Sequence, residues 1–273
     1  MNVNFDFTGR VVIVTGAARG VGREMVAQFA ATGASIVAAD RDAEGLAETC
    51  RAVDQAQIES LVADVSSEAG AAAIVDAAVK RFGKLDVCVN NAAVAPHASV
   101  LEERVEVWDT VFAVNTRGTF LMTRAAARAM IDAGNGGRII NFSSGVTTRG
   151  SSGAAAYSAS RAATEAFSRV AAVELSPYDI LVNVVSPGLI DTQPKPLPPT
   201  MAASLSKRIP MIPLARSGEP AEVGALVLFL ASDAASYITG SVYSIDGGAG
   251  IGTRPTGPVV DEDVRYDWVT GRA

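Results

Sequence analysis

The sequence predicts an α/β protein built around a parallel sheet, and three observations carry this prediction. The chain has 273 residues, a length that sheets covered by helices often reach as one domain. Hydrophobic residues make up 49% and charged residues 19%, which supports a large core. Short β-branched runs alternate with longer alanine-rich segments of helical period, which is the pattern of repeated strand–helix–strand units.

Each expected element follows from this alternation. The short β-branched runs are the expected strands, at residues 10–15, 35–39, 59–63, 85–89, 138–142, 180–185 and 241–244. The alanine-rich segments of helical period are the expected helices, at residues 21–32, 43–53, 68–82, 106–133, 155–175 and 219–230. No internal repeat of fixed period and no domain-sized linker interrupts them, so residues 1–249 are expected to form one domain.

Two segments depart from the pattern. Residues 188–217 hold six prolines around a short helical patch at 201–208. A connection of this length inside a compact domain is typical of a lid over a functional site. Residues 250–273 form a tail rich in glycine, proline and acids, which is either frayed or docked on a neighbouring subunit.

Composition and charge argue against several classes of function. The chain has 23 Lys and Arg against 29 Asp and Glu, so nucleic acid and anionic membranes are not expected partners. Two cysteines and one histidine cannot form a Cys/His zinc cluster, so no metal site is expected. No G-x-S-x-G motif accompanies the histidine, so Ser-His-Asp hydrolysis is not expected either. Without a basic N-terminal region or a long apolar run, we expect a cytoplasmic protein.

A glycine-rich turn lies where the first strand ends and the first helix begins. Gly16, Gly20 and Gly22, with Val21 between the last two, give the spacing G-x-x-x-G-x-G, which departs from the G-x-G-x-x-G dinucleotide fingerprint. Glycine permits positive φ and close backbone approach, and a helix start offers unpaired N–H groups to a pyrophosphate. The string alone fits an ordinary turn, but its position between strand and helix favours dinucleotide binding.

Carboxylates follow the next two strands. Asp40 ends the second strand, where it would accept hydrogen bonds from an adenosine ribose and repel a 2′-phosphate, so NAD is favoured over NADP. Arg19 and Arg41 are suited to gripping a phosphate, although a solvated position explains both as well. Asp64 and Val65 end the third strand and are candidates for binding adenine, but Asp64 fits a helix cap equally well.

Further motifs follow in order along the chain. They are Asn90-Asn91-Ala92-Ala93, Asn115, Ser143-Ser144, Tyr157 with Ser160-Arg161, Pro187-Gly188 with Thr192, and Asp246-Gly247-Gly248. Together with the glycine turn, they make the chain similar to short-chain dehydrogenases/reductases over roughly residues 5–249. The resemblance implies a doubly wound Rossmann-like three-layer sandwich with a seven-stranded parallel sheet. It also implies a homotetramer or homodimer built through the long helices.

The resemblance also implies the residues that hold the cofactor. Those added to the glycine turn and the acidic and basic residues above are Asn91, Ala92, Ala93, Tyr157, Arg161, Pro187, Gly188, Ile190 and Thr192. Ala93 departs from the family pattern, which has glycine after Asn-Asn-Ala, and its β-carbon is expected to narrow the floor beneath the adenosine.

Tyr157 and Ser144 suit hydride transfer between a carbinol carbon and nicotinamide. The substrate oxygen must gain or lose a proton, so Tyr157 is the candidate acid/base and Ser144 the donor to that oxygen. Alone, a tyrosine on an alanine-rich helix is usually a packing residue, but the upstream motifs favour catalysis. Arg161 stands one turn later, where the family has lysine. Its charge suits activation of the phenol, but a guanidinium almost never deprotonates and so replaces a lysine poorly as a proton relay.

Asn115 is the fourth candidate catalytic residue. Asparagine is a poor helix former, so its place inside the expected helix 106–133 indicates a polar duty, such as holding water in a proton chain to Arg161. A kink, or a core amide satisfied by backbone, explains it as well.

The expected substrate pocket is mostly apolar and favours an uncharged hydrophobic alcohol or ketone. Its residues are Ala95, Pro96, His97, Ser144, Val146, Thr147, Ala154, Tyr157, Leu189, Met201, Leu205 and Met211. His97, a lone histidine in a loop, fits a solvated position as well.

The sequence therefore predicts an NAD-dependent oxidoreductase that interconverts a hydrophobic secondary alcohol and a ketone. Arg161 alone raises the alternative of an NAD-binding pseudoenzyme or regulatory subunit with little turnover. A third possibility keeps the fold and uses bound cofactor for dehydration or epimerisation.

Overall fold

The computed structural model describes residues 4–53, 57–192 and 196–255, apart from the side chain of residue 201. A seven-stranded sheet with strand order β3-β2-β1-β4-β5-β6-β7 forms its centre, and every neighbouring pair is parallel. The strands are β1 (Val11–Thr15), β2 (Ser35–Asp40), β3 (Ile58–Val62), β4 (Val87–Asn90), β5 (Gly137–Phe142), β6 (Ile180–Pro187) and β7 (Val242–Ile245). The predicted doubly wound, Rossmann-like α/β fold is confirmed, and the strand order reverses between β1 and β4.

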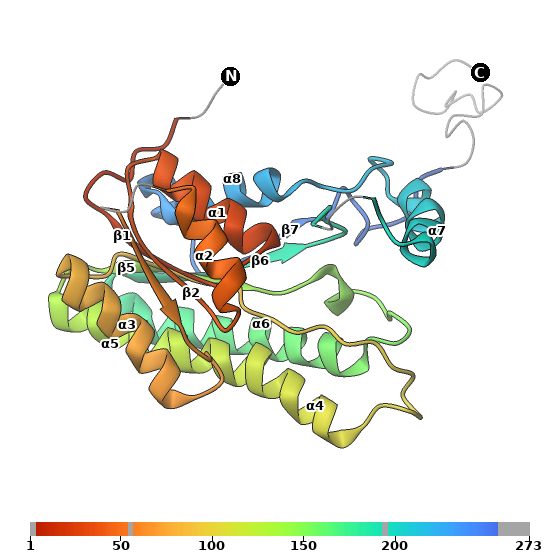
Figure 1. Ribbon diagram of the computed structural model, residues 1–273, viewed down its shortest axis with the longest axis horizontal. Helices are drawn as coiled ribbons and strands as arrows, with labels where there is room; N and C mark the ends of the chain where they lie inside the picture. The colour runs from red at the N-terminus through yellow and green to blue at the C-terminus, as the bar shows by residue number, and fades with distance from the viewer. Residues whose placement is uncertain (1–3, 54–56, 193–195, 256–273) are drawn as a thin grey trace, which may run out of the picture.

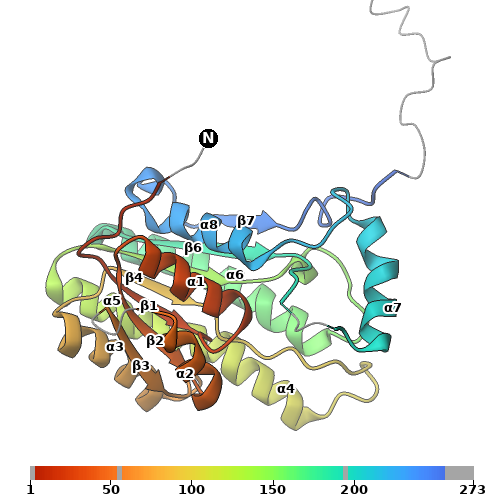
Figure 2. The same cartoon turned by 45° about the horizontal axis from the view of Figure 1, so that its top comes forward.

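Helices cover both faces of the sheet, as Figures 1 and 2 show. Successive residues of β1 point to opposite faces: Val12 and Val14 pack with the buried side of α1 and α8, whereas Val11 and Ile13 pack with α3, α5 and α6. The bounds are α1 (Gly20–Ala31), α2 (Ala43–Arg51), α3 (Glu68–Phe82), α4 (Val105–Phe112), α5 (Thr119–Ala133), α6 (Ala155–Leu175), α7 (Pro199–Arg208) and α8 (Pro220–Ala231). The two cores leave the carboxyl ends of the strands to build the site.

The predicted element ends differ from the observed ones by a few residues. The strand expected from residue 85 begins at Val87, because the buried carboxylate of Asp86 accepts the Val11 N–H at 2.7 Å in place of a strand carbonyl. The helix expected to reach residue 53 ends at Arg51.

The long helix expected at 106–133 is interrupted. A π turn at Ala113–Gly118 separates α4 from α5, and Asn115 lies within it. Such a turn inserts one extra residue into the helix and re-aims its side chains, and here the Asn115 amide points at the backbone of Val94.

The proline-rich segment carries α7, which confirms the helical patch expected at 201–208. Figure 2 shows α7 standing apart from both helical layers at one end of the molecule. The first part of the tail reaches this segment, since the Arg254 N–H donates to the Met211 carbonyl at 3.0 Å. Residues 193–195 of the expected lid and 256–273 of the expected tail lie outside the described residues. Among the described residues, no helix has the length and apolar character needed to cross a bilayer.

Candidate active site

The predicted site residues follow the carboxyl ends of parallel strands, which meet at one edge of the sheet. Asp40 ends β2, Asn91 follows β4, Ser144 follows β5, and Pro187 ends β6. The glycine turn joins β1 to α1 at the same edge.

The glycine turn is packed too closely for side chains. A β-carbon on Gly22 would collide with the Gly16 carbonyl, and one on Gly16 would lie 2.8 Å from the Ala92 Cα. Gly16 and Gly20 also have positive φ, at 68° and 56°. The Asn91 amide donates to the carbonyls of Thr15 (2.9 Å) and Gly16 (3.1 Å). The two N–H donors of the Asn91 side chain therefore stabilise the shape of the turn. They are not free to donate to a cofactor.

The start of α1 offers backbone donors to an anion. Its N-cap is Arg19, and among the described residues no side chain forms a capping hydrogen bond there. The first-turn N–H groups are therefore available to a diphosphate. Thr192 lies beside this turn, because its Cβ would be 3.3 Å from a β-carbon on Gly20. The closely packed turn and the uncapped helix start fit the diphosphate of a dinucleotide.

Asp40 lies half-buried beside the glycine turn. Its two carboxylate oxygens accept the N–H groups of Ala18 and Asp42, each at 3.0 Å. Each oxygen keeps a further acceptor position, so the carboxylate can also accept ribose hydroxyls. Arg19 and Arg41 are both exposed, as a solvated rim requires.

Asp64 does not cap the next helix. Ser67 is the N-cap of α3 and accepts the Gly70 N–H at 3.0 Å, whereas Asp64 accepts the Ser66 N–H at 2.8 Å. Hydrogen bonding to Ser66 lowers the pKa of Asp64. The neighbouring Val65 is buried, and its side chain limits the space at Gly118 of the π turn.

The remaining predicted cofactor residues complete the edge. The Ala92 N–H donates to the Thr15 hydroxyl at 3.2 Å, and the Ile190 backbone forms a parallel bridge with Gly218. Ala93 is exposed and its φ lies outside the left-handed region, so the backbone at this position does not require glycine.

Tyr157 and Arg161 lie one turn apart on α6. The guanidinium carbon of Arg161 is 5.2 Å from the centroid of the Tyr157 ring, and one of its terminal nitrogens donates to the Phe142 carbonyl at 2.7 Å. Arg161 is 3% exposed, and its Nε has no hydrogen-bond partner among the described residues. A buried cation with an unused donor fits an anionic or polar partner at this place.

The surroundings of Tyr157 favour its ionised form. Burial raises the pKa of Tyr157, but the charge of Arg161 and side-chain hydrogen bonds with Arg161 and Ser144 together bring this pKa below its ordinary value. An acid/base group near neutral pH requires a shift in this direction. The structure thus brings together three of the four predicted catalytic residues.

Asn115 is tied to backbone and to α6. Its Oδ1 accepts the Val94 N–H at 2.9 Å, and its Nδ2 donates to the Val94 carbonyl and the Ser160 hydroxyl, both at 3.0 Å. Both amide hydrogens are thus occupied, which matches the explanation of a satisfied core amide. Its predicted role in a proton chain stays a prediction.

Glu165 is a supporting residue that the sequence analysis missed. One of its carboxylate oxygens accepts the hydroxyls of Ser143 (2.5 Å) and Thr147 (2.9 Å). These residues flank Ser144, so Glu165 holds the segment that carries Ser144. Its position four residues after Arg161, on the same helix face, was the signal that could have identified it.

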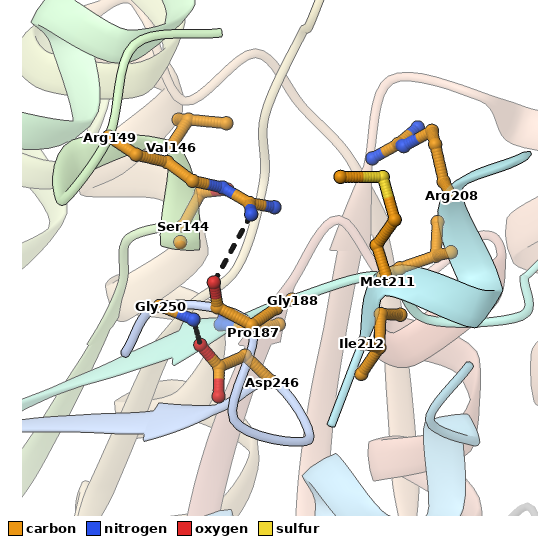
Figure 3. A pocket seen from close by; sticks show the side chains of 13 residues that line it. Ser144, Val146, Arg149, Pro187, Gly188, Arg208, Met211, Ile212, Asp246 and Gly250 are labelled. Atoms are coloured by element: carbon orange, nitrogen blue, oxygen red, sulfur yellow. Dashed lines mark hydrogen bonds between the residues drawn. The ribbon is translucent and has the colours of Figure 1, made fainter. Parts of the chain in front are cut away.

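A cavity opens beside Ser144 between the ends of β5, β6 and β7 and the proline-rich segment (Figure 3). Of the expected substrate residues, Ser144, Val146, Leu189 and Met211 line it. The cavity lining lacks the other expected residues, Ala95, Pro96, His97, Thr147, Ala154, Tyr157 and Leu205. His97 is exposed, and the Met201 side chain lies outside the described part of the chain. The other lining residues are Gly145, Arg149, Pro187, Gly188, Arg208, Ile212, Asp246, Ala249 and Gly250.

Comparison with known proteins identifies relatives over most of the chain. The family described as Enoyl-(Acyl carrier protein) reductase matches residues 16–250. A D-threitol dehydrogenase from Mycolicibacterium smegmatis is 38% identical over 91% of this chain and 96% of its own length. A trans-4-hydroxycyclohexanecarboxylate dehydrogenase from Sinomonas cyclohexanicum is 39% identical over 88% of this chain and 92% of its own length. The crystal structure of a short-chain type dehydrogenase/reductase from Mycobacterium marinum superposes with a TM-score of 0.82 at 33% identity, covering 90% of this chain and 97% of that one.

Proposed function

Because the chain belongs to the short-chain dehydrogenase/reductase family, an oxidoreductase family that uses a nicotinamide cofactor on CH–OH groups, we propose that it is an NAD-dependent enzyme interconverting a secondary alcohol and a ketone. The contact of the buried Arg161 guanidinium with Tyr157 carries this proposal. The two relatives named above differ in their alcohols, so neither substrate is transferred to this chain.

Tyr157, Ser144 and Arg161 have separate roles in the proposed reaction. The glycine turn, the start of α1 and Asp40 would hold the dinucleotide, and its nicotinamide would supply the hydride acceptor for oxidation and the hydride donor for reduction. During oxidation the Tyr157 phenolate accepts the hydroxyl proton, and during reduction the phenol returns it. Ser144 donates a hydrogen bond to the same substrate oxygen and so orients it. Arg161 stabilises the phenolate by its charge.

The preference for NAD is supported by Asp40. A 2′-phosphate on the adenosine ribose would meet this carboxylate, which is held in place by the N–H groups of Ala18 and Asp42. The repulsion would disfavour NADP, whereas ribose hydroxyls can donate to the same oxygens. Arg19 and Arg41 are exposed, so solvent and salt screen their charges. The fixed carboxylate of Asp40 should therefore have the larger effect on the choice of cofactor.

A homotetramer or homodimer is proposed for the assembly. Large apolar side chains are exposed on the long helices, including Val105 and Trp108 on α4 and Val170 and Val173 on α6. Burial of such side chains against a second copy would remove apolar surface from water. Location in the cytoplasm stays a prediction.

Spectroscopic detection of NADH tests the proposed reaction. The purified protein is incubated with NAD and a panel of secondary alcohols between about pH 7 and pH 10. Tyr157→Phe should lower the oxidation rate by about a hundredfold or more, the usual contribution of acid–base catalysis. Tyr178→Phe, at a tyrosine that is 51% exposed beyond the end of α6, is the matched control and should leave the rate unchanged. A Tyr157→Phe enzyme as fast as the parent would refute the assignment.

A pseudoenzyme is the second candidate, and Arg161 favours it because a guanidinium held by the Phe142 carbonyl is a poor proton relay. NAD binding without NADH formation from any alcohol of the panel would support this alternative. Stoichiometric release of NADH during turnover would exclude both this candidate and dehydration or epimerisation with retained cofactor.

A further inference from the structure

Two guanidinium groups lie on opposite walls of the cavity beside Ser144. Arg149 follows the 3-10 turn Gly145–Thr147, and Arg208 is the last residue of α7. Figure 3 shows both side chains extending toward the space between these walls. The sequence predicts a mostly apolar pocket with few fixed charges, so the pair of cations changes the class of ligand that fits.

Among the described residues, few groups use the hydrogen-bonding capacity of these arginines. One terminal nitrogen of Arg149 donates to the Ala249 carbonyl at 3.1 Å, which fixes the side chain and leaves the rest of its five donors. No ion pair involves Arg149 or Arg208 within the ranges that the structure describes. Both groups can therefore receive an anionic ligand without first breaking an ion pair with a described residue.

The acidic residue that lines the cavity does not form an ion pair with Arg149 or Arg208. Asp246 is the acidic residue among its lining residues, and its carboxylate accepts the N–H groups of Gly248 (2.9 Å) and Gly250 (2.7 Å). These bonds hold Asp246 within its own turn. The cavity thus carries a local positive charge on a chain whose net charge is −6, and such a charge attracts anions.

The cavity has a reacting end and a charged end. Ser144 marks the first, and Val146, Leu189 and Met211 supply apolar wall. We propose that Arg149 and Arg208 bind the carboxylate of the substrate, so that the enzyme acts on a hydroxy acid and its keto acid with an apolar body. The carboxylate is unchanged in the reaction: the carbinol carbon loses its hydride and the hydroxyl loses its proton, as in the proposed function on which this inference rests.

The planar fork of arginine supports the choice of a carboxylate, because it matches two carboxylate oxygens at once. The diphosphate of the cofactor has a separate place at the glycine turn and the start of α1, where Thr192 lies. The arginines are therefore assigned to the substrate.

Binding can be measured without turnover. A cycloalkane carboxylate that lacks the hydroxyl is titrated calorimetrically into protein saturated with NADH, alongside its primary amide. The acid should bind, whereas the amide should bind at least about tenfold more weakly, because hydrogen bonds to a charged group are the stronger ones. The Kd of the acid should rise about tenfold in Arg149→Gln and in Arg208→Gln, and more in the double variant. Lys207→Gln, on the same turn of α7 but outside the cavity lining, is the control.

Kinetics give a second readout. Secondary alcohols carrying a carboxylate at increasing distance from the carbinol carbon are compared with their amides. Each arginine variant should raise the KM of the acids about tenfold and leave kcat and the KM of the amides unchanged. Added salt should raise the KM of the acids only, since it screens the exposed charges.

The possible outcomes separate the two proposals. Equal binding of acid and amide would overturn the carboxylate site even if alcohols are oxidised. Tight, arginine-dependent binding of the acid without any NADH formation would refute the proposed oxidoreductase activity and retain the anion site. Loss of NADH affinity in the arginine variants would reassign the residues to the cofactor, and binding of inorganic phosphate in preference to the carboxylate would overturn the choice of anion.

Discussion

The guanidinium carbon of Arg161 lies 5.2 Å from the centroid of the Tyr157 ring, and both residues come from α6. The four-residue spacing brings the two side chains to the same face of the helix. The cation is buried, so its field at the phenol is weakly screened by water. A permanent charge therefore occupies the place where the family has lysine.

Removal of this charge should move the pH dependence of oxidation. In the proposed reaction the base is the Tyr157 phenolate, so oxidation should be fast above the pKa of Tyr157 and should be lost as the pH falls through it. In Arg161→Gln this pKa should rise, because the charge and hydrogen bond that lower it are gone. The midpoint of kcat/KM against pH should move upward, and the rate at neutral pH should fall about tenfold for every tenfold decrease in the phenolate fraction. The control is Arg128→Gln, at an exposed arginine of α5.

Arg161→Lys separates charge from shape. Because lysine keeps the positive charge, the midpoint of the pH profile should stay much closer to that of the parent than in Arg161→Gln. The measurement is the same profile of kcat/KM with the same alcohol. A change as large as that of the glutamine variant would show that the guanidinium acts by its shape rather than by its charge.

Replacement of Asp40 should change the choice of cofactor. Asp40→Asn removes the charge that would repel a 2′-phosphate and one strong acceptor for the ribose, so the ratio of kcat/KM for NAD over NADP should fall about tenfold or more. Initial rates with both cofactors measure the ratio. Asp42→Asn is the control, since Asp42 caps α2 and asparagine also caps helices well. An unchanged ratio in Asp40→Asn would contradict the proposed preference for NAD.

The glycine turn should not tolerate a methyl group. In Gly22→Ala the β-carbon meets the Gly16 carbonyl, so the backbone must shift at a cost of about 1 to 3 kcal/mol in the free energy of unfolding. NADH affinity should fall with it, as the turn loses its shape. Urea denaturation and fluorescence titration with NADH give the two values. Gly252→Ala, at a position with no neighbour within 4 Å of the added carbon, should change neither.

Acid should weaken the start of α8. Glu222 closes a capping box with Glu219, and the hydrogen bonds from Arg216 and Glu219 bring the pKa of Glu222 to about 2 from an ordinary 4.5. A depressed carboxyl pKa contributes stability above pH 4.5, and this contribution is lost as the pH falls toward 2. The Tm difference between the parent and Glu222→Gln should therefore shrink over this range. Glu174→Gln, at an exposed residue of α6, provides the comparison.

The fold was predictable because each of its signals is local. β-branched runs and alanine-rich helical segments alternate along the whole chain, and each observed strand overlaps the run that predicted it. The π turn was not predictable from period alone, since it depends on the contact of Asn115 with Val94, which comes from a separate loop. Whether Asp64 caps the next helix was likewise not predictable, because Asp and Ser are both good N-cap residues. Only the folded backbone places Ser67 at the N-cap of α3.

The site was predictable only in part. Ser144, Tyr157 and Arg161 belong to short sequence motifs, and each motif lies on one element or at its end. Ser144 follows β5, and Tyr157 and Arg161 lie on α6. Arg149 and Arg208 carry no such motif, because the cavity joins a turn after β5 to the end of α7, and only the folded chain brings them to one space.

Asn115 gives the site a mechanical property. Its amide group joins the loop after β4, through Val94, to the helix of Tyr157, through Ser160. A displacement of that loop would strain these hydrogen bonds and so act on the turn of α6 that lies between Tyr157 and Arg161. A substitution at Asn115 would remove this connection while every group proposed to touch the ligand is retained.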